Sequence, residues 1–312
     1  MRTQRFRTSL AVVGFIGASA VVLSAQTYRT ALPGTVNYVE GQASINGQPL
    51  NTRQDGNIQL RPNESLMTGN GKAEILLSPG VFLRAGSNSE IRMVSPGLAD
   101  PTVEVVHGSA MVEVDQKLKD ARVDVLEHGA MSSILKEGLY RFDSDQGRVE
   151  TIDGKMSVVE NGQTKEIGRG REITLNGAPL KPVSFDRKAE DDLYRWSSVR
   201  SGYLAEANQS TAQYVYGGYG PYWGDGWYWN PYFAAWSWLP GDGYFYSPFG
   251  YGFFSPAYVA YAPYRAGYGF RGGYRGGSFA SRGVSLSPRI AGGGGFRGGG
   301  GGFHGGGGGG RR

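Results

Sequence analysis

Residues 65–115 read SLMTGNGKAEILLSPGVFLRAGSNSEIRMVSPGLADPTVEVVHGSAMVEVD. Their apolar side chains recur at every second position, as in Ala73, Ile75 and Leu77 and again in Val112 and Val114. Successive side chains of a strand point to opposite faces, so this period of two predicts half-buried β-strands. Glycines that allow tight turns separate the runs: Gly69, Gly71, Gly80, Gly86, Gly97 and Gly108. The stretch therefore predicts short strands that share one core.

The same pattern extends on both sides of this stretch. Val36 and Tyr38 precede Glu40-Gly41, and Ala43 and Ile45 follow, which predicts a hairpin. Strand, turn and strand then recur to about Leu175 at intervals of roughly ten to fifteen residues, a spacing typical of all-β folds. We expect an all-β domain over residues 34–175, built as a β-sandwich or a twisted β-solenoid of many short strands.

The order of motifs in this domain resembles a known family. V-x-G-x-A-x-I is followed by Leu-Met-Thr-Gly, G-x-A-x-I-x-L, V-x-V-x-x-G-x-x-x-V-x-V, Gly-Leu-Tyr-Arg-Phe and V-x-T-x-x-G-x-x-x-V, at residues 39–45, 66–69, 71–77, 103–114, 138–142 and 149–158. Together they resemble the FecR domain of bacterial envelope proteins, over nearly all of residues 35–175.

The resemblance implies a location and a role. In the signalling members of that family, the domain is extracytoplasmic and relays the state of an outer-membrane transporter, across a single span, to a cytoplasmic anti-sigma segment. Here only eight or nine residues precede the first apolar run, so we expect no anti-sigma segment in this polypeptide. What the resemblance implies is an exported, non-catalytic β-module that contacts another component of the envelope.

The N-terminus predicts export. Arg2, Arg5 and Arg7 precede an apolar run over residues 10–23, and small residues follow it, as in a signal peptide. We expect residues 1–25 to be this peptide, cleaved after Ala25, with residues 26–33 as a linker. Cleavage after Ala20, or retention as a membrane anchor, is the alternative. The expected location is the periplasm or cell surface, with no transmembrane span after cleavage.

Beyond the β-domain the period changes. Apolar residues fall three or four apart and predict an amphipathic helix over residues 184–208, with Asp186 as its N-cap: Phe185, Ala189, Leu193, Trp196, Val199 and Tyr203. This helix is expected to pack on or beside the β-domain. A partner-binding or self-association helix is the alternative.

Residues 213–268 form an aromatic tract rich in Gly and Pro. Such a composition favours a disordered, low-complexity segment whose rings cluster on themselves, on the β-domain or on a partner. The tract holds five of the six tryptophans, which are candidates for stacking on cell-surface glycans: Trp223, Trp227, Trp229, Trp236 and Trp238.

Residues 269–312 form a Gly/Arg-rich tail that is expected to be disordered. From residue 211 onward there are 8 Lys/Arg against 2 Asp/Glu, whereas residues 26–210 hold 21 against 25. Beyond residue 25, the net charge is thus negative up to residue 210 and positive only at the C-terminal end of the chain. Arg271, Arg275 and Arg297 lie in Arg-Gly-Gly units and are candidates for contact with a polyanion, and self-association through the tail is an alternative.

Residues suited to catalysis are scarce. Without cysteine the chain has no disulfide or thiol chemistry. His107 and His128 precede turn glycines, and His304 lies in the tail, so none is expected to act in a catalytic or metal site. Alternation with valine predicts solvated strand faces for four carboxylates: Glu113, Asp115, Asp124 and Glu127.

These observations indicate a non-enzymatic protein with no catalytic, cofactor-binding or metal-binding residues. The leading hypothesis is a binding, sensory or regulatory module whose partner is an envelope protein or a cell-surface glycan. A structural or adhesive protein that binds glycan or polyanion through its tail is the first alternative. A carbohydrate-processing enzyme, which would need a carboxylate pair across a cleft, is the second.

Overall fold

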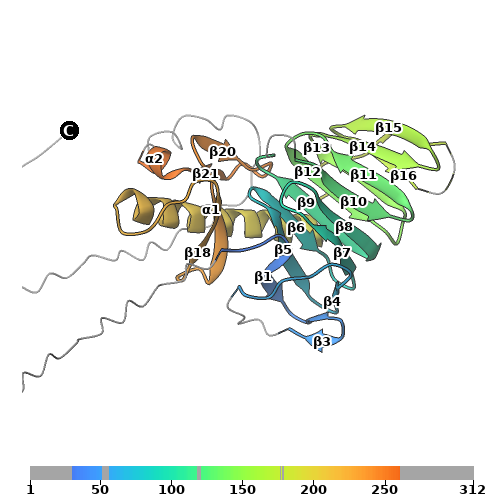
Figure 1. The fold of residues 1–312 in the computed structure, drawn as a ribbon. Helices are drawn as coiled ribbons and strands as arrows, with labels where there is room; N and C mark the ends of the chain where they lie inside the picture. The colour runs from blue at the N-terminus through green and yellow to red at the C-terminus, as the bar shows by residue number, and fades with distance from the viewer. Residues whose placement is uncertain (1–29, 51–55, 118–120, 176, 178, 261–312) are drawn as a thin grey trace, which may run out of the picture. The chain divides into compact units, whose positions relative to one another are not determined.

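The computed structural model describes residues 30–50, 56–117, 121–175, 177 and 179–260 (Figure 1). The predicted signal peptide and the Gly/Arg-rich tail lie outside the described residues. Within this part the protein is mostly β, as the alternating pattern predicts.

Most strands belong to two large sheets. Sheet A has eight strands in the order β1 (Thr35–Glu40), β5 (Lys72–Ser78), β6 (Val81–Ala85), β9 (Ser109–Val114), β12 (Gly138–Asp143), β13 (Arg148–Asp153), β16 (Arg171–Thr174) and β17 (Val183–Ser184). Sheet B has nine in the order β15 (Gln163–Gly168), β14 (Lys155–Glu160), β11 (Ala130–Ile134), β10 (Val123–Glu127), β8 (Pro101–His107), β7 (Glu90–Pro96), β4 (Ser65–Thr68), β2 (Ala43–Ile45) and β3 (Gln48–Pro49).

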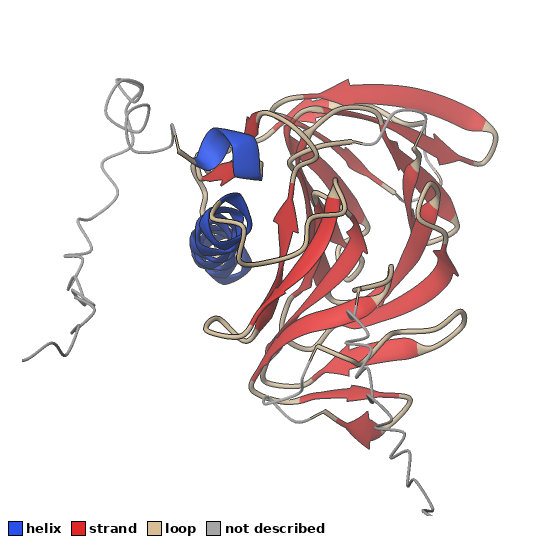
Figure 2. Ribbon diagram, turned by 60° about the vertical axis from the view of Figure 1, so that its left-hand side comes forward, coloured by secondary structure: helices blue, strands red, loops and turns tan. Residues whose placement is uncertain are grey.

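The chain builds both sheets almost in sequence order. It places one to three consecutive strands in one sheet and then crosses to the other, as from β5 and β6 to β7 and β8. Neighbouring strands are antiparallel except β8 and β10. The sheets pack face to face as a sandwich that winds forward like a solenoid, so both forms of the expected all-β fold describe it (Figure 2).

The core lies between the sheets and comes from the alternating residues. Sheet A contributes Ile75, Val112 and Phe142, and sheet B contributes Val103 and Val125, all fully buried. Burial of apolar surface stabilises a fold by about 25 cal/mol per Å². This cluster accounts for a domain that folds without disulfides.

The first hairpin predicted from the sequence is wrong. β1 pairs with β5 in sheet A, whereas β2 pairs with β3 and β4 in sheet B. Glu40-Gly41 is a corner between sheets. Gly41 has φ +74°, and a Cβ there would meet the carbonyl oxygen of Asn70 at 2.5 Å, so the corner needs glycine for conformation and for space.

The helix lies further along the chain than predicted. α1 spans Asp192–Tyr216, and its N-cap is Asp191, whose carboxylate accepts a hydrogen bond from the Tyr194 amide at 2.8 Å. Val199 and Tyr203, predicted for the buried face, are exposed. The buried residues of α1 are instead small or polar in large part: Leu193, Trp196, Ser197, Arg200, Ser201, Leu204, Ala205, Ala207, Asn208, Thr211 and Ala212.

The described part of the aromatic tract, residues 213–260, is ordered, which corrects the expectation of disorder for these residues. It forms β18 (Gly226–Asn230) paired with β19 (Ala235–Leu239), β20 (Tyr244–Tyr246) paired with β21 (Gly252–Phe254), and the short helix α2 (Pro256–Val259). Figure 1 shows these elements beside α1, on one side of the sandwich. We call α1, β18–β21 and α2 together the aromatic layer.

Candidate binding surface

Charged residues on the outer face of sheet A are buried beneath the aromatic layer. Glu74 of β5, Arg84 of β6 and Glu113 of β9 come from three adjacent strands, and their side chains are inaccessible to solvent. Arg84 Nε donates to Glu74 Oε2 at 2.9 Å, and its Nη1 donates to Glu113. Glu113 is thus not on a solvated face, and the prediction for it is wrong.

α1 completes this ionic network. Arg200 Nη2 donates to Glu74 Oε1 at 2.8 Å, and Ser201 Oγ donates to Glu113 Oε1 at 2.6 Å. Two guanidinium groups therefore face two carboxylates. A buried ion pair is stable only when its charges are compensated, and here each carboxylate has a guanidinium partner, although Arg84 Nη2 and Arg200 Nε are buried without a hydrogen-bond partner among the described residues. The network fixes the position of α1 on sheet A.

Burial and pairing have opposite effects on these groups. Burial alone would raise the pKa of Glu74, but Arg200 and Arg84 together outweigh it and hold that pKa below its ordinary value. Asp115 lies next along the same strand face. Burial, and then the Glu113 carboxylate, raise the pKa of Asp115 well above its usual range. Pairing with the two arginines therefore favours the carboxylate form of Glu74, whereas burial favours the protonated form of Asp115.

Buried asparagines attach the hairpins to the domain. The Asn37 amide in β1 donates to the Trp236 carbonyl at 3.0 Å and accepts from the Trp236 amide at 2.8 Å. Asn208 of α1 donates to the carbonyls of Trp238 and Phe254 at 2.8 and 3.0 Å. Each side chain satisfies peptide groups that have no strand partner at that point, so the hairpins are held without joining the main sheets.

Three of the five candidate stacking tryptophans are buried. Trp227 packs edge-on against Phe82 with ring centroids 5.3 Å apart, and Trp238 lies 5.6 Å from the Phe253 ring. Trp236 is also buried, and its indole N–H donates to the Gly56 carbonyl at 2.8 Å. These rings have no face open to a glycan, which corrects their prediction as stacking residues.

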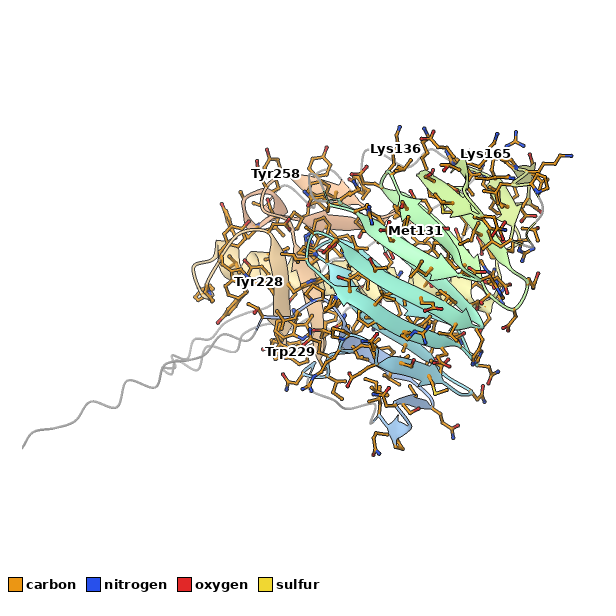
Figure 3. The ribbon with its side chains drawn as sticks, turned by 45° about the vertical axis from the view of Figure 1, so that its right-hand side comes forward. Met131, Lys136, Lys165, Tyr228, Trp229 and Tyr258 are labelled. Carbon is orange, nitrogen blue, oxygen red and sulfur yellow. The ribbon has the colours of Figure 1, made fainter. Side chains whose placement is uncertain are left out.

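Trp223 is the most accessible of the five tryptophans, at 42% exposed, and Trp229 is partly buried. The Trp223 ring lies parallel to Tyr228, with centroids 4.2 Å apart and planes 8° apart, and Tyr222 stacks on Tyr228 at 6.0 Å. We call these three residues the ring stack. In Figure 3, Tyr228 and Trp229 lie on the aromatic layer, away from Met131 and Lys165 of sheet B.

Hydrogen bonds hold the ring stack in place. The Tyr222 hydroxyl donates to the Gly241 carbonyl at 2.6 Å, and the Tyr228 hydroxyl donates to the Gly224 carbonyl at 2.8 Å and accepts from the Trp223 amide at 2.9 Å. Because these hydrogen bonds already restrict the rings, little side-chain conformational entropy is lost when a ligand binds. The stack is therefore a preorganised aromatic platform.

A second group of exposed rings lies at the C-terminal end of α1. Tyr214, Tyr216 and Tyr219 are 56%, 62% and 74% exposed, and the Tyr214 and Tyr219 rings lie 5.9 Å apart. We call them the tyrosine cluster. The prediction of binding residues, which considered only tryptophan, missed them. The signal available in the sequence was that residues 201–260 contain no Lys or Arg among so many aromatic residues.

A polar cavity of about 190 Å³ lies between sheet A and the segment that leads into α1. Arg141 and Arg148 line it, and both are paired: Arg141 with Asp191 at 2.6 Å, and Arg148 with Glu150 at 3.0 Å. Burial raises the pKa of Glu150, although Arg141 and Arg148 oppose the shift. Because both arginines that line the cavity are paired with carboxylates, the cavity does not favour a ligand of one charge.

The remaining carboxylates predicted to be solvated are also buried. Asp124 accepts from Arg122 Nε and Ser133 Oγ, each at 2.7 Å. Glu127 is 1% exposed, and burial, followed by the Asp143 charge, raises its pKa to about 8. Both carboxylates are buried, which alternation alone does not reveal.

His128 is a turn residue with φ +50°, and its ring contacts the Ser144 carbonyl. Within the described ranges, no group of three His, Asp or Glu residues is placed to hold a metal ion. Nor does any described helix combine the length and apolarity that membrane crossing requires. Arg271, Arg275, Arg297 and His304 lie outside the described residues, so their predicted roles remain predictions.

Comparison with known proteins identifies few relatives. No family model and no curated protein matches the sequence. Two crystal structures of a candidate anti-sigma factor from Parabacteroides distasonis ATCC 8503 are similar over 44% of this chain, with 14% and 13% identity and a TM-score of 0.34 for each. The match spans 64% and 65% of the length of those chains. Likeness at this level supports no conclusion about activity.

Proposed function

We propose that this protein is a non-enzymatic binding module of the bacterial cell envelope, exported by its N-terminal segment. Its FecR-like β-domain is the scaffold, and its aromatic layer is the contact surface. The observation that carries the proposal is the ring stack. Trp223 and Tyr222 are each about two-fifths exposed, and both rings stack on the buried Tyr228.

The character of this surface supports binding. Trp and Tyr are among the residue types that contribute most to the binding free energy at protein interfaces. Hydrogen bonds to backbone groups fix the ring stack, so little conformational entropy is lost on association. A sensory or regulatory role also requires a partner that binds this surface in one of its states and not in another. The resemblance to the FecR domain implies that this partner is an envelope protein.

Site-specific cross-linking tests where the partner binds. A photoreactive residue replaces Tyr222 on the aromatic layer or, as a matched control, Lys165 on strand β15. We expect adducts in envelope preparations from position 222 and none from position 165. Adducts from position 165 alone would contradict the proposal and place the contact on sheet B.

Point changes are preferable to deletion here. Removal of residues 213–312 would uncover Leu76 and Phe82, which are fully buried beneath the aromatic layer. A shortened chain would then lose partners because it is destabilised or aggregates, and the result would not locate the binding surface.

A glycan is the second candidate partner, favoured by the parallel stack of Trp223 on Tyr228. Sugars present flat apolar faces to such rings. We expect Trp223→Ala to weaken retention on purified cell-wall glycan about tenfold, or about 1.4 kcal/mol. Tyr232→Ala, which removes a 91% exposed ring outside the stack, is expected to change nothing. Equal retention of both variants would exclude the glycan and leave a protein partner.

Mass spectrometry of the envelope-associated protein tests export. The mature protein is expected to begin at Gln26. A mature N-terminus upstream of Ser9, on a protein recovered with the cytosol, would contradict the envelope location.

A further inference from the structure

The tyrosine cluster has an electrostatic character that is distinct from the ring stack. It lies at the C-terminal end of α1, a helix of 25 residues with no basic residue in its last turn. The partial negative charge of a helix C-terminus favours a cation nearby. Since residues 201–260 contain no Lys or Arg, no nearby part of the sequence supplies that cation.

The rings of the cluster suit a guanidinium group. A cation within about 6 Å of an aromatic centroid is attracted by the ring face, and Arg stacks better than Lys. Tyr214 and Tyr219 have centroids 5.9 Å apart with planes inclined by 34°, so one guanidinium can reach both.

The protein already contains this arrangement elsewhere. The Arg200 guanidinium lies 4.1 Å from the Tyr38 centroid and 5.0 Å from the Tyr203 centroid. This chain therefore already forms, within its own fold, a contact in which one arginine lies against two tyrosine rings. In the tyrosine cluster the two rings are present and exposed.

The sequence after residue 260 has the complementary composition. Residues 261–312 contain eight arginines and no Asp or Glu, and Arg271 and Arg275 are each followed by two glycines. Because glycine has no side chain, the neighbouring arginine can place its guanidinium parallel to a tyrosine ring without a steric clash. Residues 201–260 carry the opposite charge. Apart from tyrosines, their ionisable side chains are three carboxylates: Glu206, Asp225 and Asp242.

We propose that the tyrosine cluster of one molecule binds Arg-Gly-Gly units from residues 261–312 of a second copy. The contact is heterologous, because the acceptor and the donor are different parts of the chain. Each copy has one acceptor cluster and one donor segment, so association continues head to tail and forms open chains or closed rings. This self-assembly goes beyond partner binding at the ring stack and does not depend on it.

Sedimentation velocity of the full-length mature protein over a range of concentrations tests the proposal. We expect the average mass to rise with concentration for the wild type. An acceptor variant, Tyr214→Gln, Tyr216→Gln and Tyr219→Gln, is expected to stay monomeric. Control variants with Tyr232→Gln and Tyr246→Gln lose exposed tyrosines outside the cluster and are expected to associate like the wild type.

Donor variants separate ring contact from simple charge. Replacing all eight arginines of residues 261–312 with Lys keeps the charge, and we expect association to weaken at least fivefold. Unchanged association of that Lys variant would overturn the proposal, because charge alone would then suffice. Replacement with Gln is expected to abolish association.

Mixing the two defective proteins gives the decisive measurement. The acceptor variant retains its arginines, and the Gln donor variant retains its tyrosines. Each alone is expected to be monomeric, and the mixture is expected to form one-to-one dimers and nothing larger. A mixture that stays monomeric, or a wild-type protein that is monomeric at all concentrations or associates only with added polyanion, would overturn the proposal. Cross-linking from position 222 is read separately, so failure here leaves the proposed function standing.

Discussion

The side-chain amide of Asn37 hydrogen bonds to both the amide and the carbonyl of Trp236, a residue 199 positions later. Asn37 lies where the register of β1 with β5 shifts, between Val36 and Tyr38. At this register shift, the Asn37 side chain forms with Trp236 the pair of hydrogen bonds that the backbone of a neighbouring strand would form. One residue thus joins the first strand of the sandwich to the aromatic layer.

Asn37→Ala is expected to destabilise the protein by about 2–6 kcal/mol, because two buried peptide groups of Trp236 lose their partner at about 1–3 kcal/mol each. Urea unfolding followed by tryptophan fluorescence measures the change. Asn57→Ala, at an exposed position, is the control, with an expected effect within about 0.5 kcal/mol. Equal effects from the two variants would show that the Asn37 bridge contributes nothing.

Arg200→Met is expected to cost about 3 kcal/mol, since removal of one member of a buried ionic network leaves charge uncompensated. Glu74 keeps Arg84 but loses the partner that α1 supplies. Arg195→Met, an exposed position on the same helix, is the control. The expected signature is a loss of stability with faster hydrogen exchange in α1. A variant as stable as the control would mean that apolar contacts alone hold the helix.

Glu127 predicts a pH dependence of stability. Its folded pKa is about 8, above the ordinary value of 4.5, so the folded state binds more protons than the unfolded state between these two values. Stability is therefore expected to fall as pH rises from about 4.5 to 8 and then to level off for this group. Glu127→Gln is expected to flatten that slope and to stabilise the protein most above pH 8.

The control for this measurement is Glu206→Gln, an exposed carboxylate on α1. We expect its pH profile of the free energy of unfolding to match that of the wild type. If Glu127→Gln also retains the wild-type slope over this range, Glu127 does not titrate as its burial requires.

Two turn glycines separate backbone strain from steric conflict. Gly129 and Gly154 have φ of +77° and +91°, but a Cβ at Gly129 meets nothing within 4 Å, whereas at Gly154 it meets the Tyr140 hydroxyl at 2.2 Å. Gly129→Ala is expected to cost about 1 kcal/mol from conformation alone. Gly154→Ala is expected to cost at least about 1 kcal/mol more, because the buried Tyr140 hydroxyl must give up hydrogen bonds.

Thermal unfolding of both variants gives the comparison directly. Equal costs for Gly129→Ala and Gly154→Ala would mean that the Tyr140 side chain moves without loss. In that case the Asp153-Gly154 turn would tolerate any residue that can adopt a positive φ.

The amino-acid sequence by itself determined the class of fold. Alternation of apolar residues in runs such as Ala73, Ile75 and Leu77 is a local property, since each side chain of a strand points opposite to the next. The glycines between runs are equally local, because a turn at Gly129 or Gly154 needs a positive φ whatever lies nearby. The existence of the strands and the positions of such turns follow from these short-range rules.

Only the tertiary structure decided what covers the second face of sheet A. Glu74, Arg84 and Glu113 alternate with core residues and look like a solvated face. They are buried because Arg200, Ser201 and the hairpins, more than 80 positions later, lie on them. Gly and Pro in the aromatic tract argue against long helices but not against short hairpins. Burial depends on partners distant in sequence, so residue type and spacing do not reveal it.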